Sequence, residues 1–217
     1  MHLFTASGAV LGLFALQAIA REQPLHALVW MMAAVVVDAV DGFLARLARV
    51  DSLTPEYDGA LLDNLVDFLN YAVVPAFFLL GTDLIDASAA PAAAALIVLA
   101  SAYQFAHADA KTQDHFFRGF PSYWNVAVFY LYFGDAGPTA NLAVIAVLAL
   151  ASFVPWKWAY PTRMTRLRGV TLVLASVWGV CLALVVRGGP AATPAFGLSL
   201  AFVAYYVVVS LYLSRRS

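Results

Sequence analysis

Long apolar stretches, separated by short segments rich in polar residues, glycine or proline, dominate the pattern along this chain. A helix needs about 20 mostly apolar residues to cross the hydrocarbon core of a bilayer. Eight stretches are candidates, of which the fifth and sixth are short: Phe4–Ala20, Leu25–Leu44, Ala60–Leu80, Ala89–Ala106, Pro121–Phe133, Asn141–Pro155, Val170–Val186 and Pro194–Leu213. The pattern predicts an all-α integral membrane protein, a bundle of eight transmembrane helices that forms one domain over residues 1–217.

Composition supports this class. Hydrophobic residues make up 63% of the chain and charged residues 12%, whereas soluble domains carry about 25% charged residues. The formal net charge of -1 provides no broad basic surface, which argues against nucleic acid as a partner and leaves membrane lipids as the expected surroundings. The single cysteine, Cys181, cannot form an internal disulfide.

Lysine and arginine are distributed unevenly between the predicted connections. With eight spans, both termini and the second, fourth and sixth loops share one side of the membrane, and ten of the 12 basic residues lie there. Only Arg21 and Arg187 lie on the other side. Basic residues accumulate in the cytoplasm, so both termini are expected there. A signal peptide cleaved after Ala20 is the alternative, but no basic residue precedes the first apolar stretch, as signal peptides usually require.

Four aspartates lie inside two neighbouring apolar stretches. Asp38 and Asp41 are three residues apart, and Asp63 and Asp67 are four apart, so each pair occupies one face of its helix. A charge inside a spanning helix costs about 2.5–3.5 kcal/mol on insertion scales, and converging carboxylates need cations. Their oxygen ligands favour Mg²⁺ or Mn²⁺. Two such ions would balance four charges and leave positions open for phosphate oxygens.

Small residues and an arginine extend the pattern. Gly42 and Ala45 share the face of the first aspartate pair, and Gly59 lies one turn before the second pair; small side chains allow close approach of a ligand or another helix. Arg46 could bind a diphosphate through its planar guanidinium. Taken singly, these features also fit helix packing, a membrane anchor or a proton relay. The combined spacing favours catalysis.

The two segments Asp-Ala-Val-Asp-Gly-Phe-Leu-Ala-Arg and Gly-Ala-Leu-Leu-Asp-Asn-Leu-Val-Asp resemble the signature of the CDP-alcohol phosphotransferases, D-x-x-D-G-x-x-A-R followed by G-x-x-x-D-x-x-x-D. The fixed positions are all filled, by Asp38, Asp41, Gly42, Ala45, Arg46, Gly59, Asp63 and Asp67. The likeness extends to about Arg168. The spacer from Leu47 to Asp58 has twelve residues, where most of the family has eight, and this longer spacer resembles the bacterial phosphatidylcholine synthases. Family members often carry a few more residues before His2, so a short N-terminus is expected.

The resemblance implies a reaction and roles for these residues. A hydroxyl of the alcohol, here choline, attacks the β-phosphate of CDP-diacylglycerol, and CMP leaves. The metal, Mn²⁺ or Mg²⁺ and two ions by expectation, would be held by Asp38, Asp41, Asp63 and Asp67, with Asp67 also the catalytic base. CDP would be bound by Asp38, Gly42, Ala45, Arg46 and Gly59. The expected location is the bacterial inner membrane, with the active site facing the cytoplasm.

Choline carries a quaternary ammonium, which proteins recognise with aromatic faces. Tyr71, Tyr123 and Trp124 are the candidate choline-binding residues, with Tyr103 a weaker one, and each is alternatively an aromatic anchor at the membrane interface. Other alcohols, namely serine, inositol or glycerol phosphate, are the runner-up substrates. A transporter with a carboxylate relay is the alternative from another class, and a homodimer is one assembly compatible with the sequence.

Overall fold

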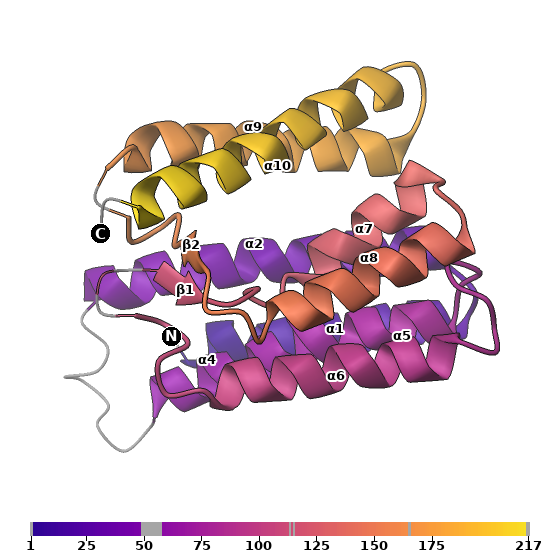
Figure 1. The fold of residues 1–217 in the computed structure, drawn as a ribbon, viewed down its shortest axis with the longest axis horizontal. Helices are drawn as coiled ribbons and strands as arrows, with labels where there is room; N and C mark the ends of the chain where they lie inside the picture. The colour runs from indigo at the N-terminus through magenta and orange to yellow at the C-terminus, as the bar shows by residue number, and fades with distance from the viewer. Residues whose placement is uncertain (1, 49–57, 113, 115, 165, 216–217) are drawn as a thin grey trace. The chain divides into compact units, whose positions relative to one another are not determined.

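Helices make up most of the chain in the computed structural model (Figure 1). The structure describes residues 2–48, 58–112, 114, 116–164 and 166–215, and for residues 43–48 it describes only the helical backbone. The chain divides into two compact units, Met1–Phe105 with Ser122–Leu150 and Ala106–Pro121 with Ala151–Ser217. The single domain over residues 1–217 stays a prediction.

The first unit is built from helices. They are α1 (His2–Ala20), α2 (Pro24–Ala48), α4 (Gly59–Phe68), the π-helical turn η1 (Leu69–Val73), α5 (Val74–Leu80), α6 (Ala90–Ala106), α7 (Trp124–Gly134) and α8 (Pro138–Ala151). A tight reversal joins α1 to α2: Glu22 has a φ of 58°, and Pro24 opens α2, where its fixed φ and missing N–H suit a first helical turn. α1 packs against α2, α4 and α5.

α4, η1 and α5 form one continuous helix, Gly59–Leu80. The side chain of Asp58 caps its start and accepts a hydrogen bond from the backbone N–H of Leu61 at 2.9 Å. In the π-helical turn, the N–H of Val74 donates to the carbonyl of Leu69, five residues back. Pro75 follows directly and has no N–H to donate to the carbonyl of Tyr71. A wider turn at this point accommodates the proline without ending the helix.

The second unit contains a small sheet and a helical hairpin. Strands β1 (Phe116–Arg118) and β2 (Lys157–Ala159) pair antiparallel, with Phe117 opposite Trp158. Helices α9 (Arg168–Arg187) and α10 (Ala192–Ser214) pack together, and the hydroxyls of Thr171 and Tyr205 are 2.8 Å apart between them. The hydroxyl of Tyr206 on α10 donates to the carbonyl of Ala159 at 2.9 Å, which joins α10 to β2.

Charged side chains in the second unit include one close ion pair. The ammonium of Lys157 lies 2.6 Å from a carboxylate oxygen of Asp114. Hydrogen bonds from Lys157 and then from Thr112 hold the pKa of the Asp114 carboxyl below its ordinary value. Both side chains remain accessible to solvent, so this pair contributes little to stability.

In the part of the chain that the structure describes, five helices are long and apolar enough to cross a membrane: α1, Pro24–Gly42 of α2, Gly59–Leu80, α9 and α10. α6, α7 and α8 are shorter, with 17, 11 and 14 residues. Within the described residues, these helices correspond to the eight predicted stretches, and the all-α membrane class is confirmed. α7 begins later than expected, at Trp124, because Ser122 has a φ of 56°, which is incompatible with a helix.

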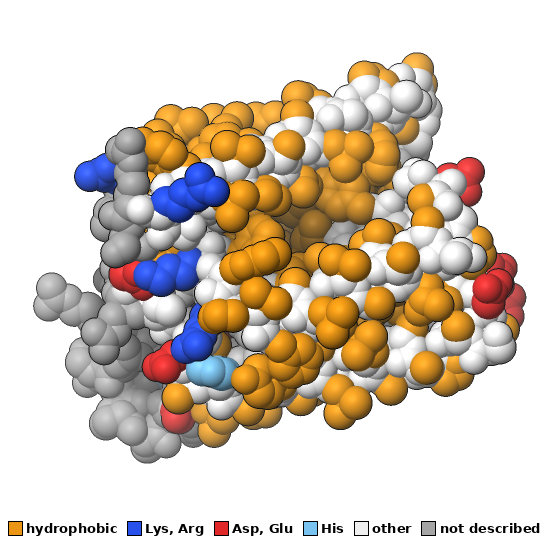
Figure 2. Space-filling view, viewed as in Figure 1, with side chains coloured by type: hydrophobic (Ala, Val, Ile, Leu, Met, Phe, Trp, Pro, Cys, Tyr) orange, Lys and Arg blue, Asp and Glu red, His pale blue; other side chains and the backbone are white. Residues whose placement is uncertain are grey.

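The surfaces of the helices fit contact with lipid. Hydrophobic side chains cover much of the visible face (Figure 2). Along α9, the exposed large residues Val170, Val173, Val177 and Val180 recur every three or four positions, which gives one continuous apolar stripe. Such a stripe would be a liability in water but is the expected surface of a helix in a bilayer.

Candidate metal and active site

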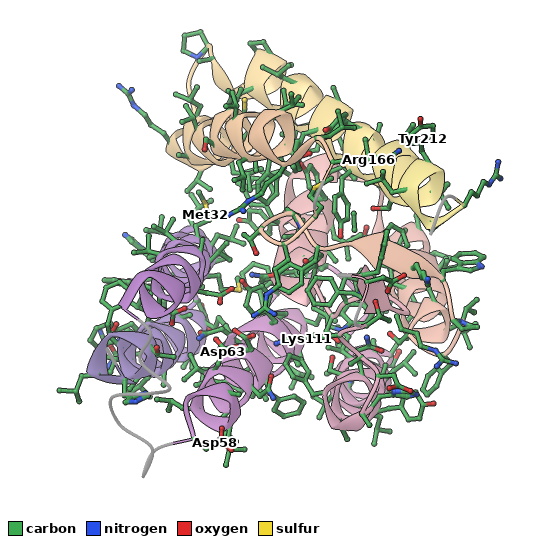
Figure 3. All side chains as sticks on the ribbon, turned by 90° about the vertical axis from the view of Figure 1, so that its left-hand side faces the viewer. Met32, Asp58, Asp63, Lys111, Arg166 and Tyr212 are labelled. Atoms are coloured by element: carbon green, nitrogen blue, oxygen red, sulfur yellow. The ribbon has the colours of Figure 1, made fainter. Side chains whose placement is uncertain are left out.

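The four aspartates line one small cavity in the first unit. The cavity lies among α1, α2, α4 and η1, and the side chains around the aspartates are Thr5, Gly8, Ala34, Val37, Val66, Asn70 and Tyr71. Figure 3 labels Asp63 on α4, with the capping Asp58 at the start of the same helix. The spacing within each helix directs both of its aspartates to the same side, and the packing of α1 against both α2 and α4 closes the cavity.

Three of the aspartates form a group suited to a metal ion. Asp38, Asp63 and Asp67 are each half-buried, and each offers a carboxylate oxygen within 4.8 Å of the others. Oxygens bound to one Mg²⁺ at about 2.0–2.1 Å lie within about 4.2 Å of one another. Small side-chain movements would therefore convert this group into a coordination shell. An all-carboxylate donor set also has the chemistry that Mg²⁺ and Mn²⁺ prefer.

The fourth aspartate lies in the same cavity but outside that group. Asp41 is 4% exposed, which makes it the most buried of the four. It follows Asp38 by three residues on α2. A carboxylate this deeply buried needs compensation by a proton or a cation. As a lining residue, Asp41 could add a further carboxylate oxygen to a cation bound in the cavity.

A tyrosine from η1 contacts the aspartate group directly. The hydroxyl of Tyr71 donates a hydrogen bond to Oδ2 of Asp38 at 2.6 Å. The ring of Tyr71 also lies near that of Tyr123, with 6.2 Å between centroids and 50° between the planes. Two of the predicted choline-binding residues therefore lie together, beside Asp38, one of the predicted metal ligands.

The third predicted choline-binding residue is oriented differently. Trp124 is 0% exposed, and its indole N–H donates to the hydroxyl of Ser101 at 2.9 Å. It does not line the aspartate cavity. Tyr103, the weaker candidate, is 48% exposed on α6. Choline binding by Trp124 stays a prediction, and the structure explains its burial by the contact with α6.

The predicted CDP-binding residues are only partly described. Gly42 is half-buried in α2, and Ala45 and Arg46 belong to the helical backbone of α2, while their side chains lie outside the described part of the structure. Gly59 begins α4, and a Cβ built there would lie 3.2 Å from the imidazole of His2. A larger residue at this position would therefore require the His2 side chain to move.

Sequence reasoning missed the polar contact between α1 and η1. The amide of Asn70 is buried, and its nitrogen donates to the carbonyls of Gly8 at 3.0 Å and Val66 at 3.1 Å. A Cβ added at Gly12 would lie 2.6 Å from Oδ1 of Asn70, and one added at Gly8 would lie 2.8 Å from a methyl group of Val66. The Gly8-Ala-Val-Leu-Gly12 spacing and an asparagine inside an apolar helix were the signals available for this contact.

Comparison with known proteins places these features in a family. Residues 2–154 match the family described as CDP-alcohol phosphatidyltransferase. Phosphatidylcholine synthase of Legionella pneumophila is 40% identical over 98% of this chain and 86% of its own length. The enzymes of the same name from Borreliella burgdorferi and Pseudomonas aeruginosa are each 34% identical over 100% of this chain, and over 94% and 91% of their own lengths. The predicted resemblance is confirmed.

Proposed function

The chain belongs to the CDP-alcohol phosphatidyltransferase family, and on this premise we propose that it is a phosphatidylcholine synthase. It transfers the phosphatidyl group from CDP-diacylglycerol to choline and releases CMP. The observation that carries the proposal is the convergence of Asp38, Asp63 and Asp67 within 4.8 Å in a cavity between apolar helices. The near full-length similarity to relatives named phosphatidylcholine synthase supports choline as the alcohol.

The proposed chemistry follows from the arrangement of the carboxylates. Asp38, Asp41, Asp63 and Asp67 would hold two divalent ions, Mn²⁺ or Mg²⁺, which neutralise the charge of the diphosphate. Asp67 accepts the proton of the choline hydroxyl as the choline oxygen bonds to the β-phosphorus. The bond between that phosphorus and the oxygen of the CMP phosphate breaks, and CMP leaves with that oxygen. The carboxylates, with the ions that they would hold, position the reactants and stabilise the charge that develops in the transition state, which is where most of the rate enhancement arises in phosphoryl transfer.

Binding of the two substrates is assigned to different parts of the site. The liponucleotide would contact Gly42, Ala45, Arg46 and Gly59. The quaternary ammonium of choline would lie against the rings of Tyr71 and Tyr123, with Trp124 as the third predicted contact. The 6.2 Å separation of the two tyrosine rings supports this location. The carboxylate of Asp38, which accepts a hydrogen bond from Tyr71, adds a nearby negative charge.

The proposal also includes an orientation in the membrane. The site would open to the cytoplasm in a bacterial inner membrane, which the concentration of basic residues on the side of both termini supports. CDP-diacylglycerol would enter from the bilayer and choline from the cytoplasm. A homodimer is compatible with this arrangement.

The test is release of CMP by the purified protein supplied with CDP-diacylglycerol, Mn²⁺ and one alcohol at a time. Release with choline, together with phosphatidylcholine identified by mass, is the expected result. Release only with serine, inositol or glycerol phosphate would replace choline by that alcohol. Absence of release with all four, combined with ion flux in vesicles, would instead favour the transporter. The Asp67→Asn variant in the same assay is the control for background hydrolysis.

A further inference from the structure

We propose that Tyr71 is a positioning residue for the metal site, and that its hydroxyl fixes the carboxylate of Asp38 in the orientation that binds the ion. The inference rests on the metal site of the proposed function. It assigns the hydroxyl of Tyr71 a task separate from the contact between its ring and choline.

The hydrogen bond itself has the geometry of a strong interaction. The donor–acceptor distance between Tyr71 and Oδ2 of Asp38 is 2.6 Å, within the range of about 2.5–2.7 Å for an O–H donor on an ionised oxygen. An ionised carboxylate only accepts hydrogen bonds, and it has about four lone-pair sites. The tyrosine occupies one of them, on Oδ2, so this bond is compatible with a cation bound to the same carboxylate.

The bond also links the two halves of the ligand set. Asp38 lies on α2, whereas Asp63 and Asp67 lie on α4, and Tyr71 follows Asp67 by four residues in the same continuous helix. Residues 49–57 of the connection lie outside the described part of the structure. The hydrogen bond from Tyr71 to Asp38 joins the helix of Asp63 and Asp67 to α2 at the site. Its loss would allow the distance between the two groups of ligands to vary.

The backbone around Tyr71 explains how its hydroxyl reaches Asp38. Tyr71 is the central residue of η1, and the wider π-helical turn changes the direction of its side chain relative to a regular α-helix. The turn begins at Leu69, whose carbonyl accepts the hydrogen bond from Val74, and Pro75 follows its end. The orientation of Tyr71 is therefore built into the helix, which suits a group that must orient a ligand before the metal arrives.

The experiment is a titration of Mn²⁺ into purified protein without substrates, with free Mn²⁺ followed by its electron paramagnetic resonance signal. Tyr71→Phe keeps the ring and removes the hydroxyl. Loss of an outer hydrogen bond to a metal ligand weakens binding by about 10–100-fold, and that increase in Kd is expected here. In the CMP assay, the Mn²⁺ concentration for half-maximal activity should rise similarly, while the KM for choline stays unchanged. Tyr71→Ala should raise the KM for choline as well.

Tyr206→Phe is the matched control, because it also removes one tyrosine hydroxyl hydrogen bond, to the carbonyl of Ala159 at 2.9 Å in the second unit. Its Mn²⁺ Kd should equal that of the wild type. The inference is overturned if Tyr71→Phe binds Mn²⁺ as the wild type does, or if Tyr206→Phe weakens binding equally. A wild type that binds Mn²⁺ but makes no phosphatidylcholine would refute the proposed function alone.

Discussion

The side-chain nitrogen of Asn70 donates a hydrogen bond to the backbone carbonyl of Gly8 at 3.0 Å, across the contact between η1 and α1. Both residues line the cavity of the aspartates. Polar bonds between membrane helices are worth about 0.6 kcal/mol on average, so this contact stabilises modestly. Its larger effect is to set how closely α1 approaches the helix that carries Asp63 and Asp67.

Gly12→Ala should therefore disturb the site. The added Cβ would lie 2.6 Å from Oδ1 of Asn70 and 3.2 Å from Leu69, and overpacking of this kind costs about 1–3 kcal/mol. We expect a lower temperature of thermal unfolding and reduced CMP release. Gly179→Ala on α9 is the control, because outside the helix's own nearby backbone no atom of the described residues lies within 4 Å of the added Cβ. The expectation fails if Gly12→Ala and Gly179→Ala change the unfolding temperature and CMP release equally. It also fails if adding Asn70→Ala to Gly12→Ala does not lessen these changes.

Asp67→Asn should reduce turnover by at least about 100-fold, because an amide cannot accept the choline proton and general-base catalysis contributes about 10²–10⁴-fold. CMP release under saturating Mn²⁺ measures this. Asp58→Asn is the control on the same helix: Asp58 caps α4 through Leu61, and asparagine caps a helix about as well. Turnover above a tenth of wild type in Asp67→Asn would remove this residue from the role of base.

Mn²⁺ should stabilise the protein independently of any reaction. An ion that binds only the folded state at 100 times its Kd adds about 2.7 kcal/mol to the free energy of unfolding. We expect the temperature of thermal unfolding to rise with Mn²⁺ and to return on addition of a chelator, which should also abolish CMP release. In the Asp63→Asn variant, Mn²⁺ should raise the unfolding temperature less than it does in the wild type. An unfolding temperature independent of Mn²⁺ in the wild type would contradict a metal site.

The Asp114–Lys157 pair predicts a small dependence on pH. The pKa of Asp114 is lowered in the folded state by Lys157 and then by Thr112, so its contribution is present above the unfolded pKa, about 3.9. It is lost as the pH falls through the folded value. Because the pair is exposed, Asp114→Asn should cost no more than about 1 kcal/mol. Thermal unfolding should show a smaller difference at pH 3 than at pH 7, and an equal difference at both would count against the pair.

The sequence predicted the parts of this structure that depend on local spacing. The positions of Asp38, Asp41, Asp63 and Asp67 in their helices follow from periods of three and four residues, and a short connection makes neighbours of the two helices. The longest helices could also be predicted from the sequence, because each presents about twenty apolar residues in succession.

Contacts between residues far apart in the sequence were harder to predict. The hydrogen bond between Tyr71 and Asp38 is made from within the π-helical turn, and a proline in a helix indicates a distortion without specifying which one. The strands Phe116–Arg118 and Lys157–Ala159 have three residues each, too few for an alternating pattern to be recognised. Their pairing is visible only in three dimensions.

Thr5 and Gly8 of α1 lie against the cavity that contains the aspartates. The first helix thus forms part of the wall of this cavity, and removal of the chain up to Ala20 would open the cavity on one side. A polypeptide shortened in this way would keep all four carboxylates and still lack one wall of the cavity around them, so the first twenty residues belong in any protein produced to test this site.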